Sequence, residues 1–338
     1  MLPPVKRSCG ETMSALLGTA ILITTGCGDD ASGSGGGTVG PGPMTGNATT
    51  TVDPDGPGTT TTADPSTSTT SAPPTDDTAE PPTTDDSGDP PPMGCGDPPV
   101  WCPPPETTWH WQLTEALDTS LDVTMYDIDL FDTDAGQITA LRDEGRVVIC
   151  YFSAGSHEDW RPDADQFPPA AIGNQLDDWP GERWLDIRDP TVRDVLAARL
   201  DLAAAKGCHG VEPDNVDGYT NDTGFPLSDS DQIDFNRWLA EQSHARALSV
   251  GLKNDVDQVL ALVPYFDWAL DEECMAYDEC DLLMPFITAN KAVFHVEYVD
   301  NPAQGPDAAL VVCPDALDRS FSTLIKHWDL DAWGIPCE

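Results

Sequence analysis

The stretch PTVRDVLAARLDLAAAKGCHGVEPD, residues 190–214, decides the predicted fold of this chain. Its residues 190–206 place apolar side chains at helical spacing, among them Val195, Leu196 and Leu200, and residues 210–214 form a short apolar run that ends in acids. A helix that leads into a short apolar strand is typical of a parallel β/α unit, because parallel strands are joined through helical crossovers.

The same alternation extends from this unit toward both ends of the chain. Further strands are expected at residues 109–113, 123–130, 147–153, 249–253, 268–272, 292–298 and 310–313. Further helices are expected at residues 135–144, 228–246 and 256–263. Eight strands within Cys95–Glu338 predict an α/β fold of the (β/α)8 TIM-barrel type, whose usual length is roughly 250 residues. No Gly-x-Gly-x-x-Gly turn follows an early strand, which argues against the competing doubly wound sheet with a nucleotide site.

The chain is strongly acidic, with 59 Asp and Glu against 16 Lys and Arg in 338 residues and a formal charge of −43. Charge of this sign repels phosphate backbones, so no nucleic-acid partner is expected, and it attracts cationic polymers. The alternative is an acidic surface that only keeps an exported protein soluble. Charge alone therefore does not distinguish a cationic substrate from an acidic surface that only keeps the protein soluble.

Residues 28–94 differ in composition from the predicted barrel domain, residues 95–338. They consist almost entirely of Thr, Pro, Gly, Ser, Ala and acids. Such a segment cannot bury enough apolar surface to offset its chain entropy. It is therefore predicted to be a disordered linker.

Residues 1–27 resemble a bacterial lipoprotein signal peptide. Lys6 and Arg7 precede an apolar stretch, 15–23, that is too short to span a bilayer. A small residue precedes Cys27, the candidate site of lipid attachment, although Thr24 departs from the large aliphatic residue usual at its position. The protein is expected to be an exported, monomeric lipoprotein of the cell surface or periplasm, held to the membrane only through this anchor. Ordinary cleavage and secretion is the alternative.

Eight further cysteines are expected to form disulfides, because an even number in an exported domain is typical of them. They are Cys95, Cys102, Cys150, Cys208, Cys274, Cys280, Cys313 and Cys337. Two pairs are close enough to close small loops and two follow by elimination, with the pairing left open by the sequence: 95 with 102 and 274 with 280, then 150 with 208 and 313 with 337. Zinc is disfavoured because these residues form no paired Cys-x-x-Cys or His-x-x-x-His pattern, and no metal or cofactor is expected.

Acidic side chains fall at the ends of several predicted strands. Asp127 and Asp129 share one face of a strand by the two-residue repeat. Glu212 and Asp214 close the fourth strand, and Glu272 closes the sixth. In a β/α barrel the carboxyl ends of all strands open on one rim, so these groups are expected to converge. Any one of them alone is more typical of a helix cap or turn.

Carboxylates gathered in a cleft with aromatic side chains favour cleavage of a glycosidic bond. One acid can protonate the leaving oxygen while the other acts as nucleophile or base. The chain has no Gly-x-Ser-x-Gly nucleophile elbow. A site for Mg²⁺ or Ca²⁺ made of carboxylates alone is a weaker alternative.

The domain resembles glycoside hydrolase family 114, whose named activity is endo-α-1,4-polygalactosaminidase. The resemblance rests on motifs such as YDIDLFD, WPGERWLDI and GVEPDNVD, in order along the chain: residues 109–113, 126–132, 149–155, 160–163, 179–187, 210–217, 251–255 and 296–298. It implies a (β/α)8 barrel with two catalytic carboxylates at Asp214 and Glu272. Asp271 and Glu273 are acidic departures from the Asn-Glu-Gln-Cys that the family more often shows, and His209 stands where Asp is common.

The resemblance implies cleavage of a galactosamine polymer, with Asp214 as nucleophile and Glu272 as acid/base or with these roles exchanged. The residues expected to line the sugar site are Trp111, Tyr126, Asp127, Asp129, Tyr151, Glu212, Asn215, Lys253 and Glu297. Asp127, Asp129 and Glu212 are expected to pair with the ammonium groups of the sugars. The alternatives are a glycosidase for neutral or acetylated galactose-type polymers and a non-catalytic, carbohydrate-binding surface lipoprotein.

Overall fold

The structure is a computed structural model that describes residue 95 and residues 100–177 and 179–338. The predicted signal peptide with Cys27 and the predicted linker, residues 28–94, lie outside the described residues. No helix within the described ranges is long and apolar enough to cross a membrane.

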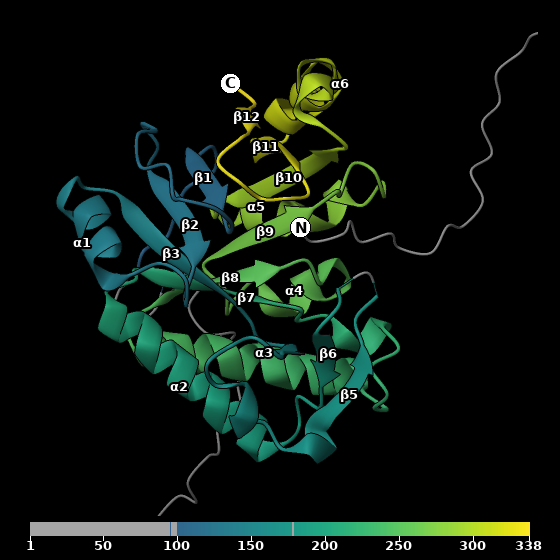
Figure 1. The fold of residues 1–338 in the computed structure, drawn as a ribbon. Coiled ribbons are helices and arrows are strands. Elements are labelled where there is room, and N and C mark those ends of the chain that lie inside the picture. Colours follow the sequence, from purple (N-terminus) through teal and green to yellow (C-terminus); the bar gives the residue numbers. More distant parts are fainter. Residues whose placement is uncertain (1–94, 96–99, 178) are drawn as a thin grey trace, which may run out of the picture. The chain divides into compact units, whose positions relative to one another are not determined.

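Eight parallel strands curl into the predicted barrel (Figure 1). In sheet order they are β1 (Trp109–Gln112), β2 (Met125–Asp129), β3 (Val147–Ser153), β7 (Gly210–Asp214), β8 (Ser249–Lys253), β9 (Trp268–Glu272), β10 (Val293–Val299) and β11 (Ser322–His327). A short strand, β12 (Ile335–Pro336), pairs antiparallel with β11. Where β1 comes close to β11, the Trp109 indole donates to the carbonyl of Ser322 at 2.8 Å.

Helices cover the outside of the sheet (Figure 1). They are α1 (Ala135–Asp143), α2 (Pro190–Lys206), α3 (Asp229–His244), α4 (Val259–Leu262), α5 (Met284–Thr288) and α6 (Gly305–Asp318). Short 3-10 turns lie at Ala164–Gln166, Pro169–Ala171, Gly218–Thr220, Val256–Gln258, Cys280–Leu283 and Pro302–Gln304. The predicted α/β alternation is confirmed, with α4 and α5 reduced to about one turn.

Local sequence fixes the bounds of the central helix α2. The Asp189 side chain accepts from the backbone N–H of Thr191 at 2.7 Å, and Pro190 occupies the first turn, where no intrahelical donor is needed. Gly207 ends the helix with φ 92°, a left-handed conformation that glycine adopts without strain. The chain then enters β7 within three residues.

The predicted eighth strand at residues 310–313 is wrong, because these residues belong to α6. Leu310 and Val311 are 77% and 78% exposed, so this apolar run faces outward instead of forming a buried strand. The true eighth strand, β11, was missed because its sequence, STLIKH, contains mostly polar residues. One of them, Lys326, is nevertheless 1% exposed.

An insertion separates β3 from α2. Its strands β4 (Ser156–Glu158), β5 (Ile172–Gln175) and β6 (Glu182–Leu185) form a separate antiparallel sheet in the order β4-β6-β5. Gly155 lets this insertion leave β3 beside β7, since a Cβ atom there would lie 1.7 Å from the backbone oxygen of Asn215. The insertion thereby comes to lie near the end of β7.

Four disulfides join the cysteines of the barrel domain, and their pairing is the one expected from short loops and elimination. They are Cys95–Cys102, Cys150–Cys208, Cys274–Cys280 and Cys313–Cys337. Cys150–Cys208 links β3 to the segment before β7, and Cys274–Cys280 closes the loop after β9. Of these two bonds, Cys274–Cys280 constrains a segment next to the carboxyl end of a strand, whereas Cys208 lies just before the amino end of β7.

Candidate active site

A cleft of about 950 Å³ opens at the carboxyl ends of the barrel strands. The insertion forms one wall, and the segments after β9 and β11 contribute to the other, with Glu273, Tyr277 and Trp328 among their residues. Asp214 and Glu272 both line this cleft. The predicted convergence of remote strand ends is therefore present in the fold.

Lys253 lies at the centre of the carboxylate cluster and is 2% exposed. Its Nζ atom is 3.0 Å from Glu212 Oε1, 3.1 Å from Asp214 Oδ1 and 3.1 Å from Glu272 Oε2. Burial opposes its charge, but the nearby carboxylates outweigh burial and hold the pKa of Lys253 well above its ordinary value. One ammonium thus gathers three acids from strands β7 and β9.

Asp214 receives further hydrogen bonds from neighbouring side chains. The Tyr151 hydroxyl donates to Asp214 Oδ2 at 2.9 Å, and the Asn215 amide donates to the same oxygen at 3.4 Å. Asn215 also donates to Ser153 Oγ at 2.9 Å. These donors hold the Asp214 carboxylate in one orientation.

Glu272 has a matching set of partners. The Tyr298 hydroxyl donates to Glu272 Oε1, and the Asn254 amide donates to Oε2 at 3.3 Å. The Asn254 side-chain oxygen accepts the backbone N–H of Glu272 at 3.0 Å. Each candidate catalytic carboxylate is therefore bonded to Lys253, a tyrosine and an asparagine, and this symmetry does not distinguish their roles.

Two predicted sugar ligands lie beneath the cleft and do not line it. Glu212 is fully buried and accepts the Trp111 indole N–H at 3.1 Å. Burial raises the pKa of Glu212 to about 7. Burial, followed by the adjacent Glu212 carboxylate, raises the pKa of Asp127 well above its ordinary value. Asp127 and Glu212 thus form a buried acid pair that supports Lys253, which corrects their predicted role in binding ammonium groups.

Asp129 reaches the cleft, but a buried arginine neutralises it. Arg161 bonds both of its oxygens, at 3.1 and 2.7 Å, and bonds Glu158 Oε1 at 2.8 Å. Backbone N–H groups of Phe131 and Asp132 also donate to Asp129. This carboxylate therefore ties the insertion to β2, and the prediction that it pairs with sugar ammonium groups is not supported.

Tyr126 and Glu297 are the other predicted site residues that lie away from the cleft. Tyr126 packs in the core, and its hydroxyl donates to the carbonyl of Leu121 at 2.7 Å. Glu297 is 8% exposed and bonds the loop after β9. Trp111, Tyr151, Asn215 and Lys253 do line the cleft as predicted.

Glu182 is a cleft residue that the sequence reasoning did not single out, although it lies in the WPGERWLDI motif. It comes from the insertion strand β6, is 6% exposed, and accepts from Ser156 Oγ at 2.8 Å. Burial, followed by the nearby Glu158 carboxylate, raises the pKa of Glu182 to about 8. Glu182 therefore holds its proton more tightly than an ordinary glutamate, and it lines the same cleft as Asp214 and Glu272.

This raised pKa predicts a pH dependence of stability. The folded state keeps the proton of Glu182 up to about pH 8, whereas an unfolded glutamate loses it near its ordinary pKa, so stability falls as pH rises through this window. Glu182→Gln removes the effect and should gain up to about 4 kcal/mol relative to wild type between pH 5 and pH 9. Urea unfolding at both pH values tests this, with Glu241→Gln, exposed on α3, as the control. A stability difference that is the same at both pH values contradicts the prediction.

The clustered carboxylates do not form a metal-ligand group in the described part of the chain. There, the convergent set is Cys274, Cys280 and His295, whose ligand atoms lie within 4.8 Å of one another. The two sulfur atoms are bonded to each other, so neither offers a thiolate.

Comparison with known proteins fits this geometry. The family model for glycoside-hydrolase family GH114 matches residues 94–338. The chain belongs to this family. Members of GH114 are O-glycoside hydrolases, and the barrel with its two cleft carboxylates is the corresponding catalytic domain.

Similar proteins include one of closely related structure. The crystal structure of Aspergillus fumigatus Ega3 in complex with galactosamine has 46% sequence identity and a TM-score of 0.66, covering 70% of this chain and 97% of that chain. The glycoside hydrolase domain of PelA from Pseudomonas aeruginosa shares the fold at 15% identity, with a TM-score of 0.55 and coverage of 68% and 97%. An uncharacterized protein of Deinococcus radiodurans is 27% identical over 233 residues, 59% of this chain and 74% of that protein.

Proposed function

We propose that this GH114 member is an endo-acting hydrolase of α-1,4-linked galactosamine polymers. The observation that carries the proposal is the gathering of Asp214 and Glu272 on one buried ammonium in an open cleft. The similarity to a structure that contains galactosamine supports the substrate class. The four disulfides support an exported protein, for which the lipid anchor at Cys27 remains part of the proposal.

The geometry favours retention of configuration. Asp214 Oδ1 and Glu272 Oε2 each lie 3.1 Å from the same Nζ atom, so they can be at most twice that distance apart. Retaining glycosidases separate their carboxyl groups by about 5 to 5.5 Å, and inverting enzymes by about 6.5 to 9.5 Å. The bound applies to the two oxygens that face Lys253 and lies nearer to the shorter range, so a retaining mechanism is part of the proposal.

In the proposed mechanism Asp214 attacks the anomeric carbon while Glu272 protonates the departing glycosidic oxygen. The C–O bond of the polymer breaks, and a sugar ester of Asp214 forms. Glu272 then takes a proton from water, whose oxygen attacks the same carbon and releases Asp214. Tyr151 and Tyr298 keep the two carboxylates oriented through their hydroxyl groups.

Recognition of a cationic sugar is assigned to carboxylates on the cleft walls. Asp177 is exposed on the insertion, Asp132 follows β2 with its side chain 80% exposed, and Asp329 follows β11 with its side chain 60% exposed. All three line the cleft. They remain accessible to an ammonium group, whereas Glu212 is committed to Lys253.

The substrate proposal predicts a response to salt and to acetylation. Pairs between partly exposed charges weaken when the screening length falls from about 10 Å at 0.1 M salt to about 3 Å at 1 M. KM for de-N-acetylated galactosaminan should rise with salt, and the fully acetylated polymer should be a poor substrate that responds little. Release of reducing ends from both polymers over a salt series measures this.

Equal or better cleavage of the acetylated polymer, without a salt effect on either, contradicts the cationic substrate. That outcome favours the alternative of a neutral or acetylated galactose-type polymer and leaves the two-carboxylate mechanism standing. Binding without release of reducing ends from any polymer contradicts the enzymatic proposal and favours a carbohydrate-binding protein.

A further inference from the structure

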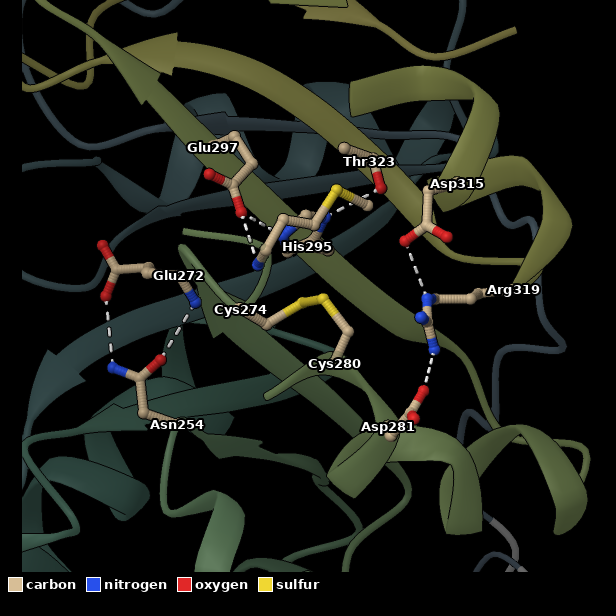
Figure 2. The surroundings of a disulfide bond; sticks show 11 residues. Asn254, Glu272, Cys274, Cys280, Asp281, His295, Glu297, Asp315, Arg319 and Thr323 are labelled. Atoms are coloured by element: carbon tan, nitrogen blue, oxygen red, sulfur yellow. Dashed lines mark hydrogen bonds and ion pairs between the residues drawn. A yellow bond between two sulfur atoms is a disulfide. The ribbon is translucent and has the colours of Figure 1, made fainter. Parts of the chain in front are cut away.

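The backbone that follows Glu272 is tied down by a second set of side chains outside the cleft. β9 ends at Glu272, and Glu273 then turns the chain with φ 64°. The Glu273 N–H donates to the carbonyl of Val296 at 2.7 Å. The Cys274–Cys280 disulfide closes the loop that begins here (Figure 2).

Glu297 holds this loop at the residue after Cys274. Its Oε1 atom accepts the backbone N–H of Met275 at 2.8 Å. The same Oε1 lies 3.0 Å from His295 Nε2, and His295 Nδ1 lies 3.0 Å from Thr323 Oγ1 (Figure 2). A relay therefore runs from β11 through β10 to a backbone amide three residues beyond Glu272.

The relay is buried and lies outside the cleft. His295 is fully buried, Thr323 is 2% exposed, and Glu297 is 8% exposed. The cleft lining described above includes Glu272, Glu273 and Tyr277 from the tethered segment, but not Glu297. The Glu297 carboxylate thus contacts the segment that forms this wall of the cleft, but on the side that faces away from the cleft.

We infer that Glu297, together with His295 and the Cys274–Cys280 disulfide, positions Glu272 for catalysis and does not bind sugar. The inference rests on the proposed function, because Glu272 must be a catalytic group for its placement to affect turnover. A displacement of about 1 Å at a reacting group can lower the rate by about 100-fold. Loss of the tether should therefore lower kcat and leave KM for the polymer nearly unchanged.

Two substitutions at Glu297 separate positioning from sugar binding. The bonds of Glu297 to Met275 and His295 use the same acceptor oxygen, Oε1, and glutamine keeps that acceptor but loses the charge. Glu297→Gln should stay within about threefold of the wild-type kcat, whereas Glu297→Ala should lose about 10- to 100-fold in kcat with an unchanged KM. A residue that pairs with sugar ammonium groups would instead raise KM in both variants.

Paired serine variants test the disulfide. Cys274→Ser with Cys280→Ser should lower kcat about tenfold or more, with KM unchanged. The control is Cys95→Ser with Cys102→Ser, which removes a disulfide of similar loop length ahead of β1. Asp315→Asn, in an exposed ion pair with Arg319 on α6, controls for surface charge near the loop. Both controls should keep the wild-type kcat.

Stability is measured for every variant, and kcat is calculated per folded molecule. A low yield of folded Cys274→Ser with Cys280→Ser is therefore not mistaken for a loss of kcat. Wild-type kcat in folded Glu297→Ala overturns the inference, as does a loss in Glu297→Gln equal to that in Glu297→Ala. An inactive wild type on every polymer contradicts the proposed function instead, which keeps the two failures distinct.

Discussion

Asp214→Asn and Glu272→Gln should each lower turnover on de-N-acetylated galactosaminan by roughly three to five orders of magnitude. Each change keeps the shape of the side chain and removes the group that attacks the sugar or transfers a proton. Folding should survive because tyrosine and asparagine partners remain at both positions. Initial rates of reducing-end release measure the effect. Asp234→Asn, with a side chain 70% exposed on α3, is the control and should retain full activity.

The two roles can be told apart with an activated substrate. An aryl galactosaminide has a leaving group that needs little protonation, so Glu272→Gln should still form the sugar ester at Asp214. Asp214→Asn should remain inactive on the same substrate. The opposite pattern exchanges the roles, and near-normal turnover in either variant removes that residue from the mechanism.

Lys253→Met should be the most damaging single change at the site for stability. It leaves Glu212, Asp214 and Glu272 without their shared ammonium, and removal of one partner from a buried charge cluster costs about 3 to 5 kcal/mol. The pKa of the remaining acids should rise, so the folded variant takes up protons as pH falls. Its stability deficit should therefore be largest at pH 8 and shrink toward pH 5.

A matched control exists in a second buried lysine. Lys291 is also 2% exposed, but its ammonium donates to the carbonyls of Val263 and Phe266 at 2.7 and 2.6 Å. Lys291→Met should also destabilise the fold, without the recovery at low pH. Urea unfolding of both variants at pH 5 and pH 8 makes the comparison. An equal deficit for Lys253→Met at both pH values contradicts the shared-ammonium account.

Most of the barrel could be predicted because its strands are short apolar runs between helical segments. Seven of the eight predicted strands overlap parallel strands of the barrel. The eighth predicted strand is wrong, because Leu310 and Val311 lie exposed on helix α6. The actual eighth strand, β11, was missed because its sequence is mostly polar although the strand is buried. Apolar composition indicates burial on average and does not determine it for one short run.

The sequence predicted which strand ends carry the acidic residues of the site, but it did not predict which side chains these acids contact. Two-residue repeats place Asp127 and Asp129 on one face, but they do not show that Arg161 neutralises one and that Glu212 lies against the other. Glu182 was missed because it enters from the insertion. The direction of a side chain at the rim depends on tertiary partners, and sequence spacing carries no information about them.

The most direct test of the central claim is the configuration of the first product. NMR spectra recorded during cleavage of de-N-acetylated galactosaminan should show the new reducing end first as the α-anomer, followed by mutarotation. That result is expected if Asp214 and Glu272, held by one ammonium, act as the pair of a retaining enzyme. The β-anomer appearing first, or wild-type amounts of product from Asp214→Asn, would contradict the account.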